Sequence, residues 1–135
     1  MLDALDQLAI HQLVALYGHI VDERQFSRAG ELFTEEVRYD MTDFGAGVLA
    51  GRQAVVDYWS LPTTRHPLVH LTTNVVIGVD ANGAVRVTSK GIGIGYGGKA
   101  GSVTYVDIVE KVDGRWLMTE RKCRLRDPST IPAIS

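Results

Sequence analysis

The sequence predicts an α+β fold in which helices come first and a long antiparallel sheet follows. Apolar residues recur at helical spacing in the first half, whereas apolar and polar residues alternate with period two from His70 onward. The turn sequences DANG and DG divide the second half into strands that follow one another directly along the chain. We therefore expect a single domain over residues 1–135, with the helices lying on one concave face of the sheet.

The first helix is predicted over about residues 4–21. Apolar side chains follow helical spacing from Leu5 to Ile20, and Asp3 and Asp6 are acids suited to a first turn.

Two shorter helices and one strand are predicted before the sheet. A periodic stretch from Phe26 to Phe33 suggests a second helix, and GRQAVVDYWS (51–60) fits a third that Pro62 stops. Between them, VRYDMTDFGAG (37–47) has the β-branched and turn residues of a short strand and a loop.

The second half is predicted to be an antiparallel meander with an irregular tail. The strands are expected in HLTTNVVIGVD (70–80), AVRVTSKGIGIGYG (84–97), SVTYVDIVEKV (102–112) and RWLMTERKCRLR (115–126). The tail DPSTIPAIS (127–135) contains two prolines and is expected to cap the cavity or to pack on a neighbour.

Charge and cysteine content exclude several classes of function. The net charge is −2 with 22% charged residues and no block of like charge, so we expect no nucleic-acid partner and no membrane partner. Cys123 is the single cysteine and cannot form an internal disulfide. No signal peptide and no apolar run of about 18 residues is present, so a reducing cytoplasm is expected.

Cofactor and nucleophile motifs are missing from the sequence. The histidines lack HExxH spacing and no metal site is predicted, and no GxSxG serine motif occurs. Gly93, Gly95 and Gly98 spell a dinucleotide fingerprint, but they lie in a strand-like stretch that no helix follows. A strand with so many glycines indicates a close approach to its backbone by a ligand, a helix or another subunit.

Tyr17 and Asp22 are the first candidate site residues. They lie five positions apart, which on an ideal helix separates them by roughly 140°. Both can line one cavity only if the helix ends near Val21. The alternative is a tyrosine ring in the core and an aspartate that caps the next helix.

His70 begins a strand whose two faces differ in polarity. His70, Thr72 and Asn74 share one face in a regular strand, whereas the other face carries Leu71, Thr73, Val75 and Ile77. The polar face either lines a site or meets water, in which case the four histidines of the chain are scattered without a catalytic role.

The DG hairpin pairs two charged residues. A two-residue loop would set Asp107 opposite Glu120, an unfavourable pair of like charges. A three-residue loop over 112–114 instead places Asp107 opposite Thr119 and diagonal to Arg121, and we favour it. A buried arginine must be paired, so these two charges form either a structural ion pair or part of a substrate site.

Four segments together resemble a known family. The segments LYGHIVDERQFSRAGELFTEEVRYD, GRQAV, HLTTNVV and YVDIVEKVDGRWLMTER are similar to the SnoaL-like branch of the NTF2-like superfamily. The resemblance implies a cone-shaped α+β barrel enclosing a pocket, a small hydrophobic or cyclic ligand, and a homo-oligomer, either dimer or trimer. This fold hosts dehydratases, isomerases, polyketide cyclases, epoxide hydrolases and non-catalytic modules.

The resemblance also implies site residues. Dehydratases of the scytalone and bile-acid types pair an aspartate at the end of the first helix with a histidine at the start of a long strand, and Asp22 and His70 match these positions. Tyr17 matches a tyrosine of the bile-acid type. The chain departs from the scytalone enzyme at Met41, where that enzyme has a second tyrosine. It also departs at Val103 and Tyr105, near which that enzyme has serine and asparagine.

The expected function is therefore a cofactor-independent dehydratase-type lyase acting on a small cyclic or polyketide-like hydroxy-carbonyl substrate. His70 is the expected base, oriented by Asp22, and Tyr17 is expected to bind the carbonyl or the departing hydroxyl. The residues expected to shape the polar end of the site are Asn74, Asp107 and Arg121.

Three alternatives remain open at this point. A ketosteroid-isomerase-like enzyme would use Asp40 as base, with Tyr17 and Asp107 holding an enolate oxygen. A polyketide cyclase would use the same pocket. A non-catalytic small-molecule-binding module would leave Asp22 and His70 more than about 3.5 Å apart.

Overall fold

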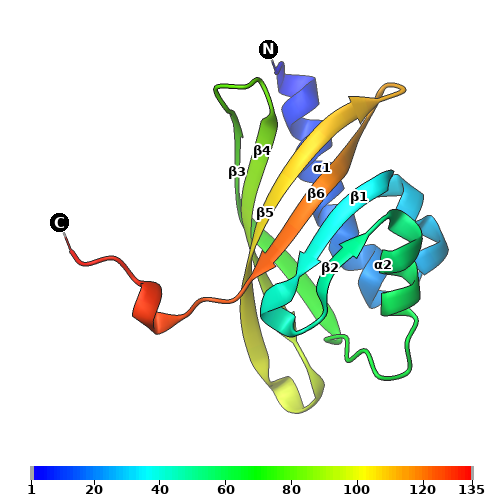
Figure 1. Cartoon of the computed structure of the whole chain (residues 1–135), viewed down its shortest axis with the longest axis vertical. Coiled ribbons are helices and arrows are strands. Elements are labelled where there is room, and N and C mark those ends of the chain that lie inside the picture. The colour runs from blue at the N-terminus through cyan, green and yellow to red at the C-terminus, as the bar shows by residue number, and fades with distance from the viewer. Residues whose placement is uncertain (1, 135) are drawn as a thin grey trace.

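The computed structural model describes residues 2–134 and shows a strongly curved sheet with two helices, α1 and α2 (Figure 1). The predicted α+β fold is confirmed. The six strands lie in the order β2-β1-β6-β5-β4-β3. The elements are α1 (Ala4–Asp22), β1 (Phe33–Met41), β2 (Gly47–Ala50), α2 (Arg52–Trp59), β3 (Val69–Val79), β4 (Val85–Ile94), β5 (Ala100–Val112) and β6 (Arg115–Arg124).

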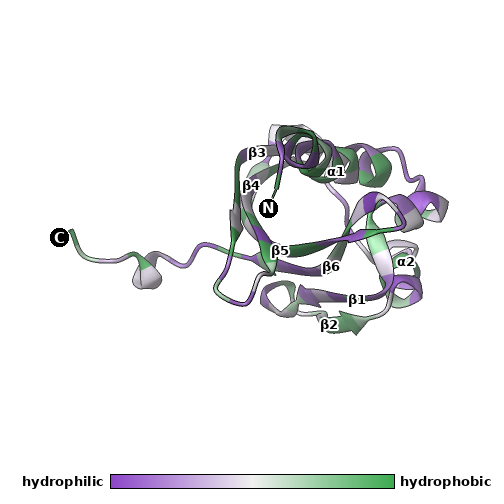
Figure 2. Ribbon diagram, turned by 90° about the horizontal axis from the view of Figure 1, so that it is seen from above, coloured by the Kyte–Doolittle hydropathy of each residue, from purple (hydrophilic) through white to green (hydrophobic). Residues whose placement is uncertain are grey.

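The sheet is not a closed barrel, because its edge strands β2 and β3 do not pair with each other. Viewed from above, the strands curve around an interior and α1 covers the open side next to β3 (Figure 2). The interior is filled by one cluster of apolar and aromatic side chains from α1, α2 and the concave face of the sheet. No helix within residues 2–134 is long and apolar enough to cross a membrane.

The first helix agrees with its prediction to within one residue. Its N-terminus is a capping box in which the Asp6 backbone donates to the Asp3 carboxylate at 2.8 Å, and the Asp3 backbone donates to Asp6 at 3.3 Å. One face of α1 is buried from Ile10 to Val21 against the sheet. The predicted third helix is also present, as α2.

The predicted second helix was too long. A 3₁₀ helix covers Phe26–Glu31, and Phe33 already begins β1, four residues before the predicted strand. The reason is long-range pairing: the backbone N–H of Met118 on β6 donates to the Leu32 carbonyl at 2.8 Å, and Phe33 pairs with Met118 in a parallel ladder. No local pattern contains that information.

Asn74 does not share a face with His70 and Thr72, as a regular strand would predict, because β3 contains a β-bulge. The register with β4 shifts between Thr73 and Val76, and Asn74 adopts a left-handed conformation with φ of 55°. His70 and Thr72 lie on the partly buried face, whereas Asn74 is exposed. Beyond the bulge, the inward positions belong to Val75 and Ile77.

The predicted three-residue loop between β5 and β6 is also wrong. Val112 pairs with Arg115, so the loop has the two residues Asp113 and Gly114, both with positive φ, as a tight hairpin turn requires. A register shift between Ile108 and Val109 leaves Thr119 as the extra residue of β6. Asp107 is therefore directly opposite Arg121, and not opposite Glu120 or Thr119.

Residues 125–134 extend away from the sheet as a largely irregular tail (Figure 1). A short 3₁₀ helix, Pro128–Thr130, interrupts it, and Ser135 lies outside the described residues. Ile131 and Ile134 remain exposed on this tail. Its expected role in capping the cavity or packing on a neighbour stays a prediction.

Candidate functional site

Asp22 and His70 form a hydrogen-bonded pair between the end of α1 and the start of β3. The His70 ring nitrogen Nδ1 lies 2.6 Å from Asp22 Oδ1, and the His70 backbone N–H donates to both carboxylate oxygens at 3.1 and 3.0 Å. The side chains retain 15% and 12% exposure. Because a carboxylate only accepts, Nδ1 is the donor, and in the neutral form of the ring Nε2 keeps a lone pair. The separation is shorter than the 3.5 Å that a non-catalytic module was expected to exceed.

Gly18 explains how helix and strand come close enough for this pair. A Cβ atom at Gly18 would lie 3.0 Å from the His70 carbonyl oxygen and 3.4 Å from the His70 Cβ. Gly18 and Asp22 are four residues apart and therefore share one face of α1. The missing side chain lets β3 pass over this turn, and the next turn presents Asp22 to the start of the strand.

Tyr17 lies beside this pair and is fully within the core, with 4% exposure. Its ring meets the His70 ring edge to face at 6.0 Å between centroids, and its hydroxyl lies 2.5 Å from that of Tyr39 in a hydrogen bond. Burial raises the pKa of Tyr17 to about 12, so the phenol stays protonated at neutral pH and can donate a hydrogen bond.

Tyr39 is a polar residue of the interior that sequence reasoning missed. It is 1% exposed on β1, and burial raises the pKa of its phenol well above the usual value. It lies two positions before Met41, at which the second tyrosine of the scytalone enzyme was expected. The sequence could have indicated Tyr39, because Tyr39 and Met41 are two apart on a strand and therefore share a face.

Asp107 and Arg121 form a fully buried bidentate ion pair that joins β5 to β6. Arg121 Nε and Nη2 donate to the two oxygens of Asp107 at 2.8 and 2.9 Å, and both side chains are 0% exposed. Burial alone lowers the pKa of Arg121, but the facing carboxylate outweighs it and holds that pKa well above the usual value. The guanidinium also lies over the rings of Tyr17 and Tyr105, at 4.2 and 3.9 Å from their centroids.

The glycine-rich strand is packed against the chain itself. A Cβ at Gly91 would lie 2.5 Å from the ring of Tyr105, and one at Gly93 would lie 2.8 Å from Pro67. These two glycines therefore make room for side chains of the same chain. The sequence had left open whether a ligand, a helix or another subunit approaches this strand, and at both positions the neighbour is a side chain of the protein itself. Ser89, two residues before Gly91, is 0% exposed and was also missed by sequence reasoning.

Two predicted site residues lie elsewhere. Asn74 is exposed on the bulge and accepts a hydrogen bond from the Thr73 hydroxyl at 3.0 Å. Asp40 follows the inward-facing Tyr39 and is partly exposed on the opposite side of β1, where it accepts from the Thr42 backbone N–H at 3.0 Å. The hydrogen bonds from Thr42 lower the pKa of Asp40. An isomerase site combining Asp40 with Tyr17 is therefore not assembled in this structure.

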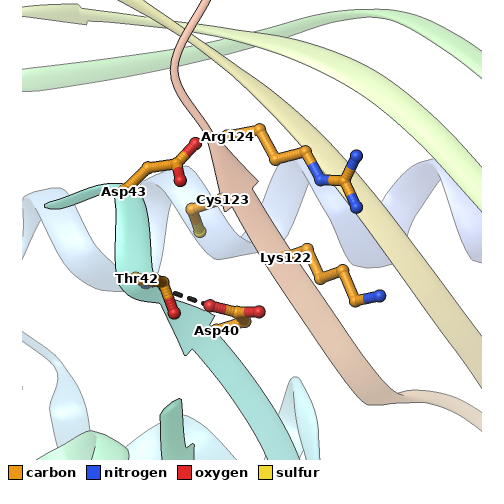
Figure 3. A pocket seen from close by; sticks show the side chains of 6 residues that line it. All are labelled: Asp40, Thr42, Asp43, Lys122, Cys123 and Arg124. Carbon is orange, nitrogen blue, oxygen red and sulfur yellow. Dashed lines mark hydrogen bonds between the residues drawn. The ribbon is translucent and has the colours of Figure 1, made fainter. Parts of the chain in front are cut away.

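An open pocket of about 350 Å³ lies at the ends of β1 and β6 (Figure 3), and neither Asp22 nor His70 lines it. It is lined by Asp40, Thr42, Asp43, Lys122, Cys123 and Arg124. We place the candidate site in the interior next to His70, because the buried polar groups converge there, whereas Asp40 and Lys122 stand on the outer face. Within residues 2–134, no cluster of three or more histidine, cysteine, aspartate or glutamate side chains is arranged to hold a metal ion.

Solved structures share this fold. A Nostoc punctiforme protein of unknown function with a cystatin-like fold is 22% identical, with a TM-score of 0.78, covering 95% of this chain and 96% of that one. A Mycobacterium tuberculosis protein of unknown function is 28% identical, with a TM-score of 0.71, covering 94% and 78%. A Novosphingobium aromaticivorans protein described as a candidate scytalone dehydratase is 21% identical, with a TM-score of 0.70, covering 91% and 85%.

The search of curated proteins returned no match. The family comparison is decisive, because the SnoaL-like domain is matched over residues 3–122, which includes both helices and nearly the whole sheet. The protein therefore belongs to the SnoaL-like domain family, on the NTF2-like fold that its structural neighbours share.

Proposed function

We propose that the protein is a dehydratase-type lyase that removes water from a small cyclic or polyketide-like hydroxy-carbonyl compound. The observation that carries the proposal is the 2.6 Å contact between Asp22 and His70, placed against the buried phenol of Tyr17. An imidazole oriented by a carboxylate is a general base suited to neutral pH, and its position beside a protonated phenol pairs a base with a hydrogen-bond donor.

The proposed reaction begins with His70 Nε2. This nitrogen takes a proton from the carbon next to the substrate carbonyl, while Asp22 holds the Nδ1–H and stabilises the imidazolium that forms. The C–O bond to the hydroxyl then breaks, and the imidazolium returns the proton to the departing oxygen, which leaves as water. Tyr17 donates a hydrogen bond to the carbonyl or to the departing hydroxyl. No step requires a cofactor.

The surroundings of the pair support a small, mostly apolar ligand. The walls next to Tyr17 are aromatic, since Phe33, Trp59 and Tyr105 all contact its ring. The neighbour described as a candidate scytalone dehydratase shares the fold. We also propose that the ligand is a hydrophobic or cyclic small molecule and that the protein is a cytoplasmic homo-oligomer, as the family resemblance implies.

Turnover by two variants tests the proposal. His70→Ala removes the base, and Asp22→Asn keeps the shape of the side chain but removes its charge. Each is expected to lower turnover on a panel of cyclic β-hydroxy ketones by roughly 10²- to 10⁴-fold, with loss of water followed by mass spectrometry. His11 is an exposed histidine on α1, the helix that carries Asp22. His11→Ala is the control and is expected to retain full turnover. Unchanged turnover in both site variants would remove the pair from the mechanism.

A further inference from the structure

His66 lies in the loop that joins α2 to β3 (Figure 1), and the proposed reaction gives it no part. Its ring nitrogen Nε2 lies 2.8 Å from the backbone carbonyl oxygen of Trp59, the last residue of α2. Because a carbonyl oxygen only accepts, Nε2 carries the proton. The last carbonyl groups of a helix have no partner within the helix, so this bond satisfies one of them. It also ties the end of the loop to α2.

The ring of His66 also packs against the aromatic side chains of the interior. Its centroid lies 5.5 Å from that of Phe26, and the Phe26 ring lies 5.4 Å from that of Trp59. The Trp59 ring in turn meets Tyr17 edge to face at 6.0 Å. The end of the loop is therefore fixed to one wall of the candidate site by a hydrogen bond and by ring contacts.

The backbone that follows His66 has little freedom. Pro67 fixes its own φ and restricts His66 to extended conformations. The ring of Pro67 fills the space beside Gly93, at which a Cβ atom would lie 2.8 Å from it. The backbone N–H of Leu68 then donates to the Ile94 carbonyl at 2.8 Å, just before β3 begins. Only three residues separate His66 from the proposed base, so a displacement of His66 is passed directly to that base.

The position of His70 tolerates little displacement. The Asp22 carboxylate meets Nδ1 of His70 at 2.6 Å and also accepts from the backbone N–H of the same residue at 3.0 and 3.1 Å. On the side of α1, the His70 carbonyl oxygen would lie 3.0 Å from a Cβ atom at Gly18. Misplacement of a catalytic group by about 1 Å can lower a rate by about 10²-fold. The reaction therefore depends on what fixes the start of β3.

We propose that His66 is a positioning residue for the base. Its hydrogen bond to the Trp59 carbonyl fixes the start of β3, so that the His70 imidazole keeps its proton on Nδ1 and its orientation toward Asp22. The effect on turnover rests on the proposed dehydration and deepens it. The effect on the imidazole of His70 is independent of any reaction.

His66 is suited to this role because it is held neutral. Burial lowers the pKa of His66, and the nearby charges of Arg24 and His70 lower it further, which outweighs the opposite effect of the bond to Trp59. At neutral pH the ring therefore donates its hydrogen bond without adding a second cation beside the imidazolium that forms on His70.

Nitrogen NMR of the imidazole rings in the full chain tests the orientation without a substrate. At about pH 8.5 an unperturbed imidazole is neutral, and the shifts of its two nitrogens show which one carries the proton. His70, assigned with His70→Ala, is expected to carry it on Nδ1. His66→Phe keeps a ring against Phe26 but has no donor, and it is expected to leave His70 exchanging between tautomers. His66→Gln places an amide N–H near the position of Nε2 and is expected to restore the Nδ1–H form.

Turnover of a compound that the wild type dehydrates gives a second readout. His66→Phe is expected to lower kcat by roughly 10- to 100-fold with KM unchanged within about twofold, and His66→Gln is expected to recover most of the loss. Thr64→Val is the matched control. It removes the 2.5 Å hydrogen bond from Thr64 Oγ1 to the Tyr58 carbonyl, which joins the same loop to the same end of α2. Thr64→Val and His66→Phe are each expected to lower the melting temperature by on the order of 4 °C, but Thr64→Val is expected to leave kcat and the His70 tautomer unchanged.

Three outcomes would overturn the positioning role. The first is a wild-type His70 tautomer or wild-type kcat in His66→Phe. The second is a Thr64→Val variant as impaired as His66→Phe, since any loosening of the loop would then suffice. The third is a His66→Gln variant no better than His66→Phe, which would assign the effect to ring packing. If the tautomers follow the expected pattern but the wild type dehydrates no compound, the positioning role stands and the proposed reaction fails.

Discussion

Tyr17 is the residue on which the polar groups of the interior converge. Its ring contacts His70 and the guanidinium of Arg121, and its hydroxyl bonds to Tyr39. The sequence left open whether Tyr17 is a site residue or a core residue. Its position in the apolar stripe of α1 combines the two roles. The ring is part of the core, and the hydroxyl is part of a buried polar network beside the candidate base.

Removal of either phenol tests this network. Tyr17→Phe and Tyr39→Phe each leave the other hydroxyl without its partner, so each is expected to lower the free energy of unfolding by about 1–2 kcal/mol. The double variant is expected to cost less than the sum, because no unpaired hydroxyl remains. Urea unfolding of all four proteins measures the coupling, and strictly additive losses would contradict it. Tyr17→Phe is expected to lower turnover more than Tyr39→Phe.

The buried ion pair gives a second prediction at this scale. Arg121→Met removes one partner and leaves the carboxylate of Asp107 buried without a counter-charge, so a loss of roughly 3–5 kcal/mol in the free energy of unfolding is expected. Adding Asp107→Leu removes the second charge and is expected to recover most of that loss. Urea unfolding checks both proteins. A double variant less stable than Arg121→Met would contradict the explanation.

At the scale of elements, the site depends on close approach between α1 and β3. Gly18 permits the contact, and its absent side chain faces the backbone of His70. Elsewhere on the sheet, irregularities set which side chains point inward. The bulge at Asn74 turns Val75 and Ile77 into the interior, and the extra residue Thr119 brings Arg121 opposite Asp107.

Gly18→Ala tests the helix–strand contact. In an isolated helix this change stabilises by about 1 kcal/mol, but here the new Cβ would meet the His70 carbonyl oxygen at 3.0 Å. We expect no gain in stability and at least a tenfold loss of turnover, because displacement of β3 separates His70 from Asp22. The reverse change at an exposed site of the same helix, Ala15→Gly, is the control. It is expected to cost about 1 kcal/mol and to leave turnover unchanged.

At the scale of the whole molecule, α1 covers the open side of the curved sheet (Figure 2). The side chains of the interior are largely shielded from water. Cys123 and Tyr17, which ionise at high pH, are inside this interior. Burial raises the pKa of Cys123 from 9.0 to about 11 and that of Tyr17 from 10.0 to about 12. Both groups are therefore held in their neutral forms by the fold.

These raised pKa values predict a loss of stability in alkali. The unfolded chain releases the protons first, so the stabilising contribution is complete below about pH 9 and is lost as pH rises through the folded values of about 11 and 12. Urea unfolding at pH 8 to 11 measures this decline, and Cys123→Ala is expected to lack its earlier part. A free energy of unfolding that stays constant up to pH 11 would contradict the prediction.

Much of the architecture could be predicted from local patterns. Helical spacing located α1 and α2, and alternation with turn residues located the meander, because these signals depend on neighbours in the sequence. The pairing of Asp22 with His70 came from the resemblance to a family and not from local pattern. Ser89 was missed because it lies in no recognisable motif, whereas Tyr39 could have been found because it shares a strand face with Met41.

The sequence by itself determined α1, α2 and the strands of the meander, and which side chains are available to the site, whereas the start of β1 at Phe33 depended on pairing with β6. Tertiary structure alone decided which of those side chains meet. The parallel pairing of β1 with β6, the bulge at Asn74 and the extra residue Thr119 are set by hydrogen bonds between distant segments. Because side chains alternate along a strand, a shift of one residue in such a ladder moves every later side chain to the opposite face.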